Sequence, residues 1–299
     1  MTKFAPLLLS ALLCSTPLMA DTNSATDLSS LIGDMMEEGN SLNYTINLAG
    51  KQRMLVQRMS KVALLISLGI ETQKNSKKLE SFAKLYDQTL KGFKKGDKDL
   101  ELTATENKDV LKQIDEVEKK WKPFYENVQK VVADGAKSKD AIDYIIENNE
   151  EMLSISNDLV TNFEESNKDL DYLSKFRLRV VNLAGRQRML IQKMTKEKLL
   201  VNELKDSSYK DKLKKSIELF DTSLTTLING NKENNISKPT NGDLKVAYDK
   251  VEKLWTKLKP LYEKDKLDKK ELMVIVDENR ELLKEMNAAV KKAETVLEY

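Results

Sequence analysis

Histidine is absent from this chain of 299 residues, and cysteine occurs once, as Cys14. A lone cysteine forms no intramolecular disulfide, and without histidine the usual Cys/His metal sites and His-dependent catalytic triads are excluded. The carboxylates, lysines and hydroxyls that remain form no recognisable catalytic arrangement in the sequence. We therefore expect a protein that is not an enzyme and that needs no cofactor or metal.

The chain also lacks an excess of charge of either sign. Lys and Arg together number 50 and Asp and Glu number 48, so the formal net charge is +2. No global basic field exists that would attract nucleic acid, which we exclude as a partner. Long apolar runs are missing as well, since no segment approaches the roughly 20 apolar residues of a membrane-spanning helix.

The first twenty residues have the pattern of a secretory signal peptide. Lys3 gives a short basic start, residues 4–13 form an apolar run, and a small residue, Ala20, precedes a polar one. We expect residues 1–20 to be removed on export, together with Cys14. The mature protein is then predicted to be periplasmic.

One segment of the chain occurs twice. Residues 47–61 read NLAGKQRMLVQRMSK and residues 182–196 read NLAGRQRMLIQKMTK, with eleven of fifteen positions identical. The four differences exchange Lys with Arg, Val with Ile or Ser with Thr. Because the two halves diverge much further elsewhere, this segment is under a constraint stronger than helix formation.

Weaker similarities at offsets of 130 and 134 extend the repeat along the chain, which divides into two modules at residues 27–166 and 167–299. With only 10 Gly and 5 Pro and abundant Leu, Lys and Glu, the sequence predicts an all-α protein. We expect two tandem up-down four-helix bundles with long helices. The predicted helices span residues 27–73, 76–94, 105–133 and 138–166 in the first module and 168–205, 208–229, 242–265 and 268–297 in the second.

The repeated segment carries an arginine on a stripe of small residues. On a helical wheel, Arg53 lies within about 60° of Ala49, Gly50 and Gln57. A mid-helix glycine costs about 1 kcal/mol relative to alanine, which indicates close approach of another backbone or of a ligand. A guanidinium in such a gap needs an anionic or hydrogen-bonding partner, and its paired donors suit a small planar oxyanion. The same arrangement recurs around Arg188.

A purely structural interpretation explains the same residues. The Ala-Gly pair would let two helices pack closely, Arg53 would extend to solvent, and the apolar positions would be plain core. Both interpretations stay open from the residues alone.

Two other repeated features are assigned to the bundle interiors. Trp121 and Trp255 recur at an offset of 134 and are predicted to be core aromatics. Asn149 and Asn279 recur in the fourth helices and predict a buried polar pair that fixes helix register.

The phrase NLAGRQRML, followed by Gln and Met, resembles the signature of the PilJ-type domain of type IV pili methyl-accepting chemotaxis transducers. It is also similar to the periplasmic helical domain of NarX/NarQ-type nitrate and nitrite sensors. The resemblance covers the mature chain as two tandem copies, and its specific residues lie in the first helix of each. It implies a four-helix bundle in which paired first helices hold nitrate or nitrite.

The resemblance implies that the arginine three residues after the motif glycine binds the anion. Carried over by position, the ligand-binding residues are Arg53, Arg188, Gly50, Gly185, Gln57 and Gln192. The neighbouring basic positions Lys51, Arg186, Arg58 and Lys193 are further candidates. Family members usually carry transmembrane helices and a kinase or methyl-accepting output, and neither is evident in this chain.

The expected function is that of an exported, non-catalytic sensor-type protein that binds nitrate or nitrite and acts on a membrane chemoreceptor or sensor kinase. Two guanidinium groups about 6 Å apart repel by roughly 3 kcal/mol, and an anion between them converts this repulsion into attraction. Arg53 and Arg188 would share one site if the modules lie side by side, whereas a homodimer would pair each arginine with its own copy. Residues 141–205 contain no Pro and a single Gly, which allows one long helix with the modules end to end, while the polar residues 164–169 would permit a hairpin instead. The alternative function is a structural or adaptor protein that docks to a membrane receptor or pilus-linked machinery, with the motif as a helix-pairing seam.

Overall fold

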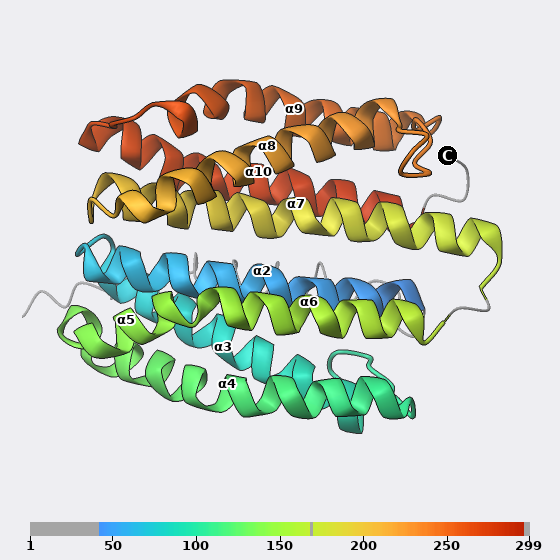
Figure 1. Ribbon diagram of the computed structural model, residues 1–299, viewed down its shortest axis with the longest axis horizontal. Coiled ribbons are helices and arrows are strands. Elements are labelled where there is room, and N and C mark those ends of the chain that lie inside the picture. Colours follow the sequence, from blue (N-terminus) through green and yellow to red (C-terminus); the bar gives the residue numbers. More distant parts are fainter. Residues whose placement is uncertain (1–41, 168–169, 296–299) are drawn as a thin grey trace, which may run out of the picture.

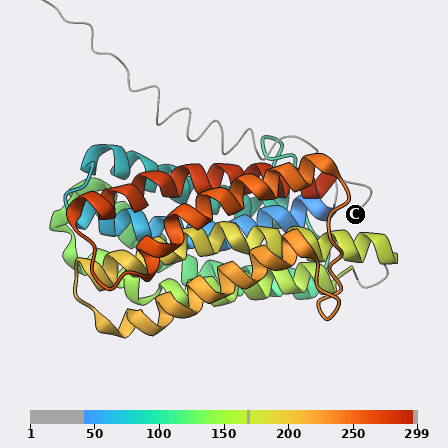
Figure 2. The same ribbon diagram turned by 90° about the horizontal axis from the view of Figure 1, so that it is seen from above.

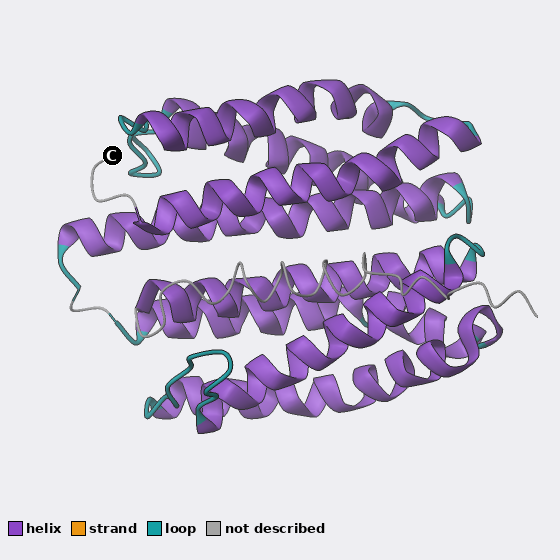
Figure 3. Cartoon of the chain, turned by 180° about the vertical axis from the view of Figure 1, so that it is seen from behind, coloured by secondary structure: helices purple, strands orange, loops and turns teal. Residues whose placement is uncertain are grey.

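The computed structural model describes residues 42–167 and 170–295. Helices dominate this part of the chain, joined by turns, short 3-10 segments and two isolated antiparallel bridges (Figure 3). The predicted all-α class is confirmed. The predicted signal peptide, and the part of the first helix before Leu42, lie outside the described residues.

The helices form two bundles stacked side by side (Figure 1). The first bundle contains α2 (Leu42–Ser67), α3 (Thr72–Lys95), α4 (Lys108–Asp134), α5 (Lys139–Glu147) and α6 (Asn149–Glu165). The second contains α7 (Tyr172–Asn202), α8 (Lys210–Asn229), α9 (Gly242–Glu263) and α10 (Lys269–Thr295).

Polar caps and glycines set several of the helix ends. The side chains of Asn107, Asp171 and Asn241 accept hydrogen bonds from backbone N–H groups in the first turns of α4, α7 and α9. Gly96 and Gly230 end α3 and α8 with φ values of 79° and 76°, a backbone conformation that costs glycine little. The repeat therefore extends to the signals that begin and end its helices.

One predicted helix is interrupted. The expected helix at residues 138–166 is divided at Asn148, where α5 ends and α6 begins. The Asn148 side chain donates to the carbonyl of Tyr144 at 2.9 Å, and the next residue, Asn149, reaches across to α2. Local side-chain bonds that compete with the helical ladder explain this irregularity.

The connection between the modules is a hairpin. After α6 the side chains of Ser166 and Asn167 donate to the carbonyl of Phe163, and Asp171 then caps α7. The chain therefore reverses direction, and one continuous helix with the modules stacked end to end is not formed.

This reversal places α2 directly against α7, in the most extensive helix–helix contact of the described chain (Figures 1 and 2). α2 is buried over residues 46–66 and α7 is largely buried over residues 184–200, because each helix packs on its own bundle and on the other first helix. Leu48, Met59, Ala184 and Met194, for example, are each fully buried.

Trp121 and Trp255 occupy matching places in the two cores, as the sequence predicts. Each indole N–H donates to an equivalent aspartate, Asp87 at 3.1 Å and Asp221 at 2.8 Å. Among the described helices, none has both the length and the apolar character needed to cross a membrane.

Candidate ligand site between the two first helices

The two motif arginines meet in the interface between α2 and α7. Arg53 is 1% exposed and Arg188 is 2% exposed, so neither extends to solvent. The place that a Cβ on Gly185 would take lies 3.4 Å from Nη2 of Arg188 and 3.9 Å from Nη2 of Arg53. Both guanidinium groups therefore point into the same region, and one chain supplies both.

Two asparagines hold these arginines in a crossed arrangement. Nη2 of Arg53 donates to Oδ1 of Asn182 on α7 at 2.8 Å, and Nη2 of Arg188 donates to Oδ1 of Asn47 on α2. Asn157 of α6 accepts a further bond from Nη1 of Arg53 at 3.0 Å. Each arginine is thus bonded to the first residue of the other copy of the motif.

Asn47 and Asn182 are site residues that the motif alone did not identify. Their signal was present, because both open the repeated segment and are identical in the two copies. Only the packing of α2 on α7 brings each asparagine to the arginine of the opposite module.

The motif glycines make room for the guanidinium groups. A Cβ on Gly50 would lie 3.2 Å from Nη2 of Arg53, closer than ordinary packing allows. The prediction that another backbone approaches these glycines is therefore wrong for the described chain. The atoms within 4 Å belong to the guanidinium groups of Arg53 and Arg188.

Gln57 and Gln192 lie one turn beyond the arginines and are fully buried. Gln192 donates to Oδ1 of Asn279 at 3.1 Å, which draws it toward α10. Neither side-chain atom of Gln57 has a hydrogen-bond partner in the described chain, and the same holds for Oε1 of Gln192. Neither glutamine bonds to an arginine, although both keep polar atoms available inside the molecule.

Charges of both signs act on Arg53 from the described residues around it. Burial, with the charges of Arg186 and Arg188, lowers the pKa of Arg53 to about 9, while the charge of Glu164 opposes the shift. Burial also raises the pKa of Glu164, whose Oε1 accepts a hydrogen bond from Asn182 at 2.7 Å. Arg53 stays charged at neutral pH, and the nearest opposing carboxylate reaches it only through an asparagine.

A second crossed set of bonds lies further along the same helices. Nζ of Lys61 donates to Oδ1 of Asn279, and Nζ of Lys196 donates to Oδ1 of Asn149, both at 2.6 Å. The two asparagines are fully buried, and each lies in the opposite module from the lysine that it binds. The two asparagines are buried, as the sequence predicts. Their bonds to the lysines that end the motif were not predicted.

The other basic motif positions differ between the copies. Arg58 lies over the ring of Phe82 at 4.0 Å, whereas its counterpart Lys193 pairs with Glu150 at 2.6 Å. Lys51 is buried and its counterpart Arg186 is exposed. Among these four candidates, only Arg186 affects the pKa of Arg53.

The two bundles are joined through first helices that carry buried arginines at equivalent positions of the repeat. The family model described as PilJ, type IV pili methyl-accepting chemotaxis transducer N-term, matches residues 35–144 and 178–295. The chain belongs to this family, in two tandem copies, as its motif predicted. The comparison with curated proteins finds no match, and the comparison with solved structures finds none either.

Proposed function

We propose that this chain is an exported, non-catalytic, periplasmic sensor-type protein that binds one small oxyanion, nitrate or nitrite, between α2 and α7. The observation that carries the proposal is the meeting of Arg53 and Arg188, from equivalent positions of the two copies, in one buried region. The family supports a sensory role related to chemotaxis. The identity of the anion rests on the chemistry of the two guanidinium groups.

Burying two like charges is unfavourable unless an opposite charge accompanies them. Among the partners of these guanidinium groups in the interface are the neutral side-chain amides of Asn47, Asn157 and Asn182. A planar monovalent oxyanion can accept paired hydrogen bonds from guanidinium groups and offset their repulsion. Burial, and after it the charges of Arg186 and Arg188, lowers the pKa of Arg53, and a bound anion would oppose this shift.

Binding would act on the pairing of the two first helices. An anion held by one arginine from α2 and one from α7 stabilises arrangements in which these helices lie close together. The expected output is a change in how α2 and α7 pack, transmitted to a membrane chemoreceptor or sensor kinase.

A second candidate function has an observation of its own. The crossed bonds from Arg53 to Asn182 and from Arg188 to Asn47 join the modules with protein groups alone. This favours a helix-pairing seam in an adaptor protein that docks to a membrane receptor or pilus-linked machinery.

Thermal unfolding in sodium nitrate, nitrite or chloride at constant ionic strength separates the two functions. An anion site predicts a rise in Tm with nitrate or nitrite over chloride, and loss of this rise in Arg53→Lys/Arg188→Lys, which keeps the charge but not the paired donors. The control Arg177→Ala/Arg280→Ala changes two arginines outside the site and should keep the rise. Equal Tm values in all three salts for the unmodified chain would exclude the anion site and leave the seam.

A further inference from the structure

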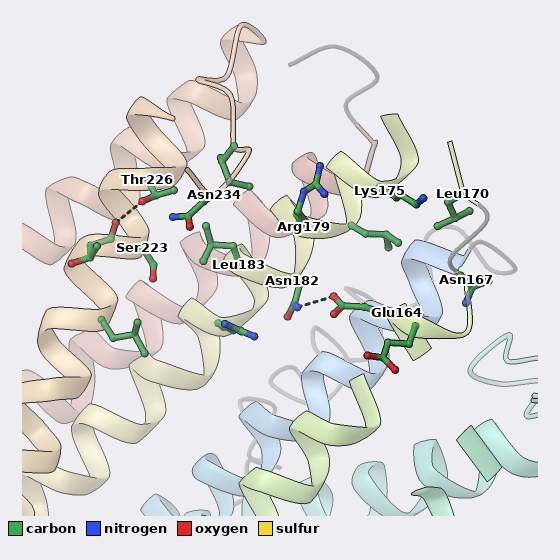
Figure 4. Close-up of a pocket in the computed structure, with 16 residues that line it drawn as sticks. Glu164, Asn167, Leu170, Lys175, Arg179, Asn182, Leu183, Ser223, Thr226 and Asn234 are labelled. Atoms are coloured by element: carbon green, nitrogen blue, oxygen red, sulfur yellow. Dashed lines mark hydrogen bonds between the residues drawn. The ribbon is translucent and has the colours of Figure 1, made fainter. Parts of the chain in front are cut away.

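A cavity of about 720 Å³ opens beside the hairpin that joins the modules. It lies between the end of α6, the first half of α7, α8 and the turn at residues 231–236 (Figure 4). Its size falls within the range of small-molecule sites, about 300–1,000 Å³. Asn182 and Glu164 form part of its wall and separate it from Arg53.

Three basic side chains of α7 line this cavity: Lys175, Arg179 and Arg186. Within the described part of the chain, none of the three side chains forms a hydrogen bond or an ion pair, and Nε of Arg179 is nevertheless buried. Figure 4 shows Lys175 and Arg179 on the same helix, above the hydrogen bond between Asn182 and Glu164. Elsewhere on α7 the situation differs, since Lys193 and Lys196 both pair with Glu150.

The cavity also has an apolar wall. Leu178 and Ile236 are nearly buried in it, and Leu183 is partly covered. Leu219 is 52% exposed, which is unusual for a large apolar side chain in this protein. An apolar ligand body against this wall would remove that surface from water.

The first module fills the equivalent place. Tyr44, which corresponds to Arg179, is buried there and donates its hydroxyl proton to the carbonyl of Leu100 at 2.8 Å. Leu85, the counterpart of Leu219, is 4% exposed. Both positions therefore differ between the modules, and in the second module both line the cavity.

We propose that this cavity is a second binding site, for a small organic carboxylate with an apolar body. The carboxylate bonds to Arg179 and Lys175, because guanidinium and ammonium groups without ion pairs recognise it directly. The apolar body packs on Leu219 and Leu183. An inorganic anion gains nothing from the leucine wall, so this site differs in ligand class from the interface between Arg53 and Arg188.

The test is a calorimetric titration of the full chain with hexanoate and, as a neutral analogue, hexanamide, at constant ionic strength. Hexanoate is expected to bind at least tenfold more tightly than hexanamide. Lys175→Ala/Arg179→Ala should weaken hexanoate binding at least tenfold, and Leu219→Ser should weaken hexanoate more than acetate. The control Lys245→Ala/Lys253→Ala removes two exposed lysines of α9 and should bind hexanoate unchanged.

The proposal is overturned if the unmodified chain binds no hexanoate, if hexanamide binds equally well, or if the α7 variant retains full affinity. Titrating nitrate into the same α7 variant distinguishes the two sites. Nitrate binding should be unchanged there, because Lys175 and Arg179 form no hydrogen bond with Arg53 or Arg188. Failure of this cavity site therefore leaves the oxyanion site untouched, and the reverse also holds.

Discussion

Glycine at positions 50 and 185 leaves room for a guanidinium group beside the helix backbone. A helical glycine normally costs about 1 kcal/mol relative to alanine, and here that cost coincides with an arginine folded back over the missing side chain. The sequence predicts that these glycines matter, because both copies keep them. It does not predict which atom fills the space, because that depends on the rotamers of Arg53 and Arg188 in the packed interface.

Alanine at position 50 should separate stability from binding. The added methyl group would lie 3.2 Å from Nη2 of Arg53 and displace the guanidinium, while alanine favours the helix. We expect Gly50→Ala to change Tm by only a few degrees and to weaken nitrate binding several-fold, with a smaller effect for Gly185→Ala, where the nearest atom lies at 3.4 Å. Gly242→Ala is the control, since its Cβ would meet nothing within 4 Å. Unchanged nitrate affinity in Gly50→Ala, measured by titration calorimetry, would argue against this role.

Glu150 gives the interface a predictable dependence on pH. Burial alone would raise its pKa, but the charges of Lys196 and Lys193 lower it from 4.5 to about 2. Because the pKa in the folded chain is lowered, the carboxylate stabilises the fold above pH 4.5, and this contribution is lost as the pH falls toward 2.

Glu150→Gln should therefore be less stable than the unmodified chain at pH 7, and the difference should shrink as the pH falls below 4.5. Urea unfolding across this pH range measures the difference in the free energy of unfolding between the two proteins. Glu126→Gln, at an exposed position outside the interface, serves as the control. A difference that stays constant down to pH 2 would show that the charge of Glu150 is not responsible.

At the scale of the elements, α2 and α7 are joined by two crossed sets of bonds. Arginines bind asparagines near one end, and lysines bind the asparagines of α6 and α10 further along. Burial of these polar groups is tolerated because each has a partner in the opposite module. The pairing of the first helices is therefore specific in register as well as extensive.

Asn279→Ala tests the lysine end of this arrangement. The substitution removes the acceptor for both Lys61 and Gln192, whose polar atoms remain buried. We expect it to lower the free energy of unfolding by about 3 kcal/mol. Asn127→Ala, which removes one half-buried bond to the carbonyl of Pro123, should cost less than about 1 kcal/mol. If urea unfolding gave the same decrease in the free energy of unfolding for both variants, the assigned role of Asn279 would be contradicted.

Several helix ends were predictable, because capping residues and glycines in the sequence mark where those helices begin and end. The interruption at Asn148 was not, since it depends on where the neighbouring Asn149 finds partners on α2. The partners of the motif arginines were missed for a related reason. Asn47 and Asn182 are recognisable as repeated residues, but a single helix does not show what lies opposite them.

At the scale of the whole molecule, one chain supplies both halves of an interface. Local sequence between residues 164 and 171 is compatible with a long helix or with a hairpin, so it does not distinguish end-to-end from side-by-side modules. The burial of apolar surface between α2 and α7 favours the hairpin. Because this contact joins residues that are far apart in the sequence, the local sequence does not reveal it. The two halves then meet at the high effective concentration that a short connection provides.

The cavity beside the hairpin belongs to this scale as well. Two of its lining positions differ between the modules, with Tyr44 and Leu85 buried in the first and Arg179 and Leu219 lining the cavity in the second. Comparison of the two copies by sequence shows the substitution but not the space that results.

The stoichiometry of nitrate binding, measured by titration calorimetry over a range of protein concentrations, tests the central claim most directly. We predict one nitrate per chain with the same affinity at every protein concentration, and loss of binding when either Arg53 or Arg188 alone is replaced by alanine. Two nitrates per chain, or a single-arginine variant that binds as tightly as the unmodified protein, would contradict a site shared between the two modules.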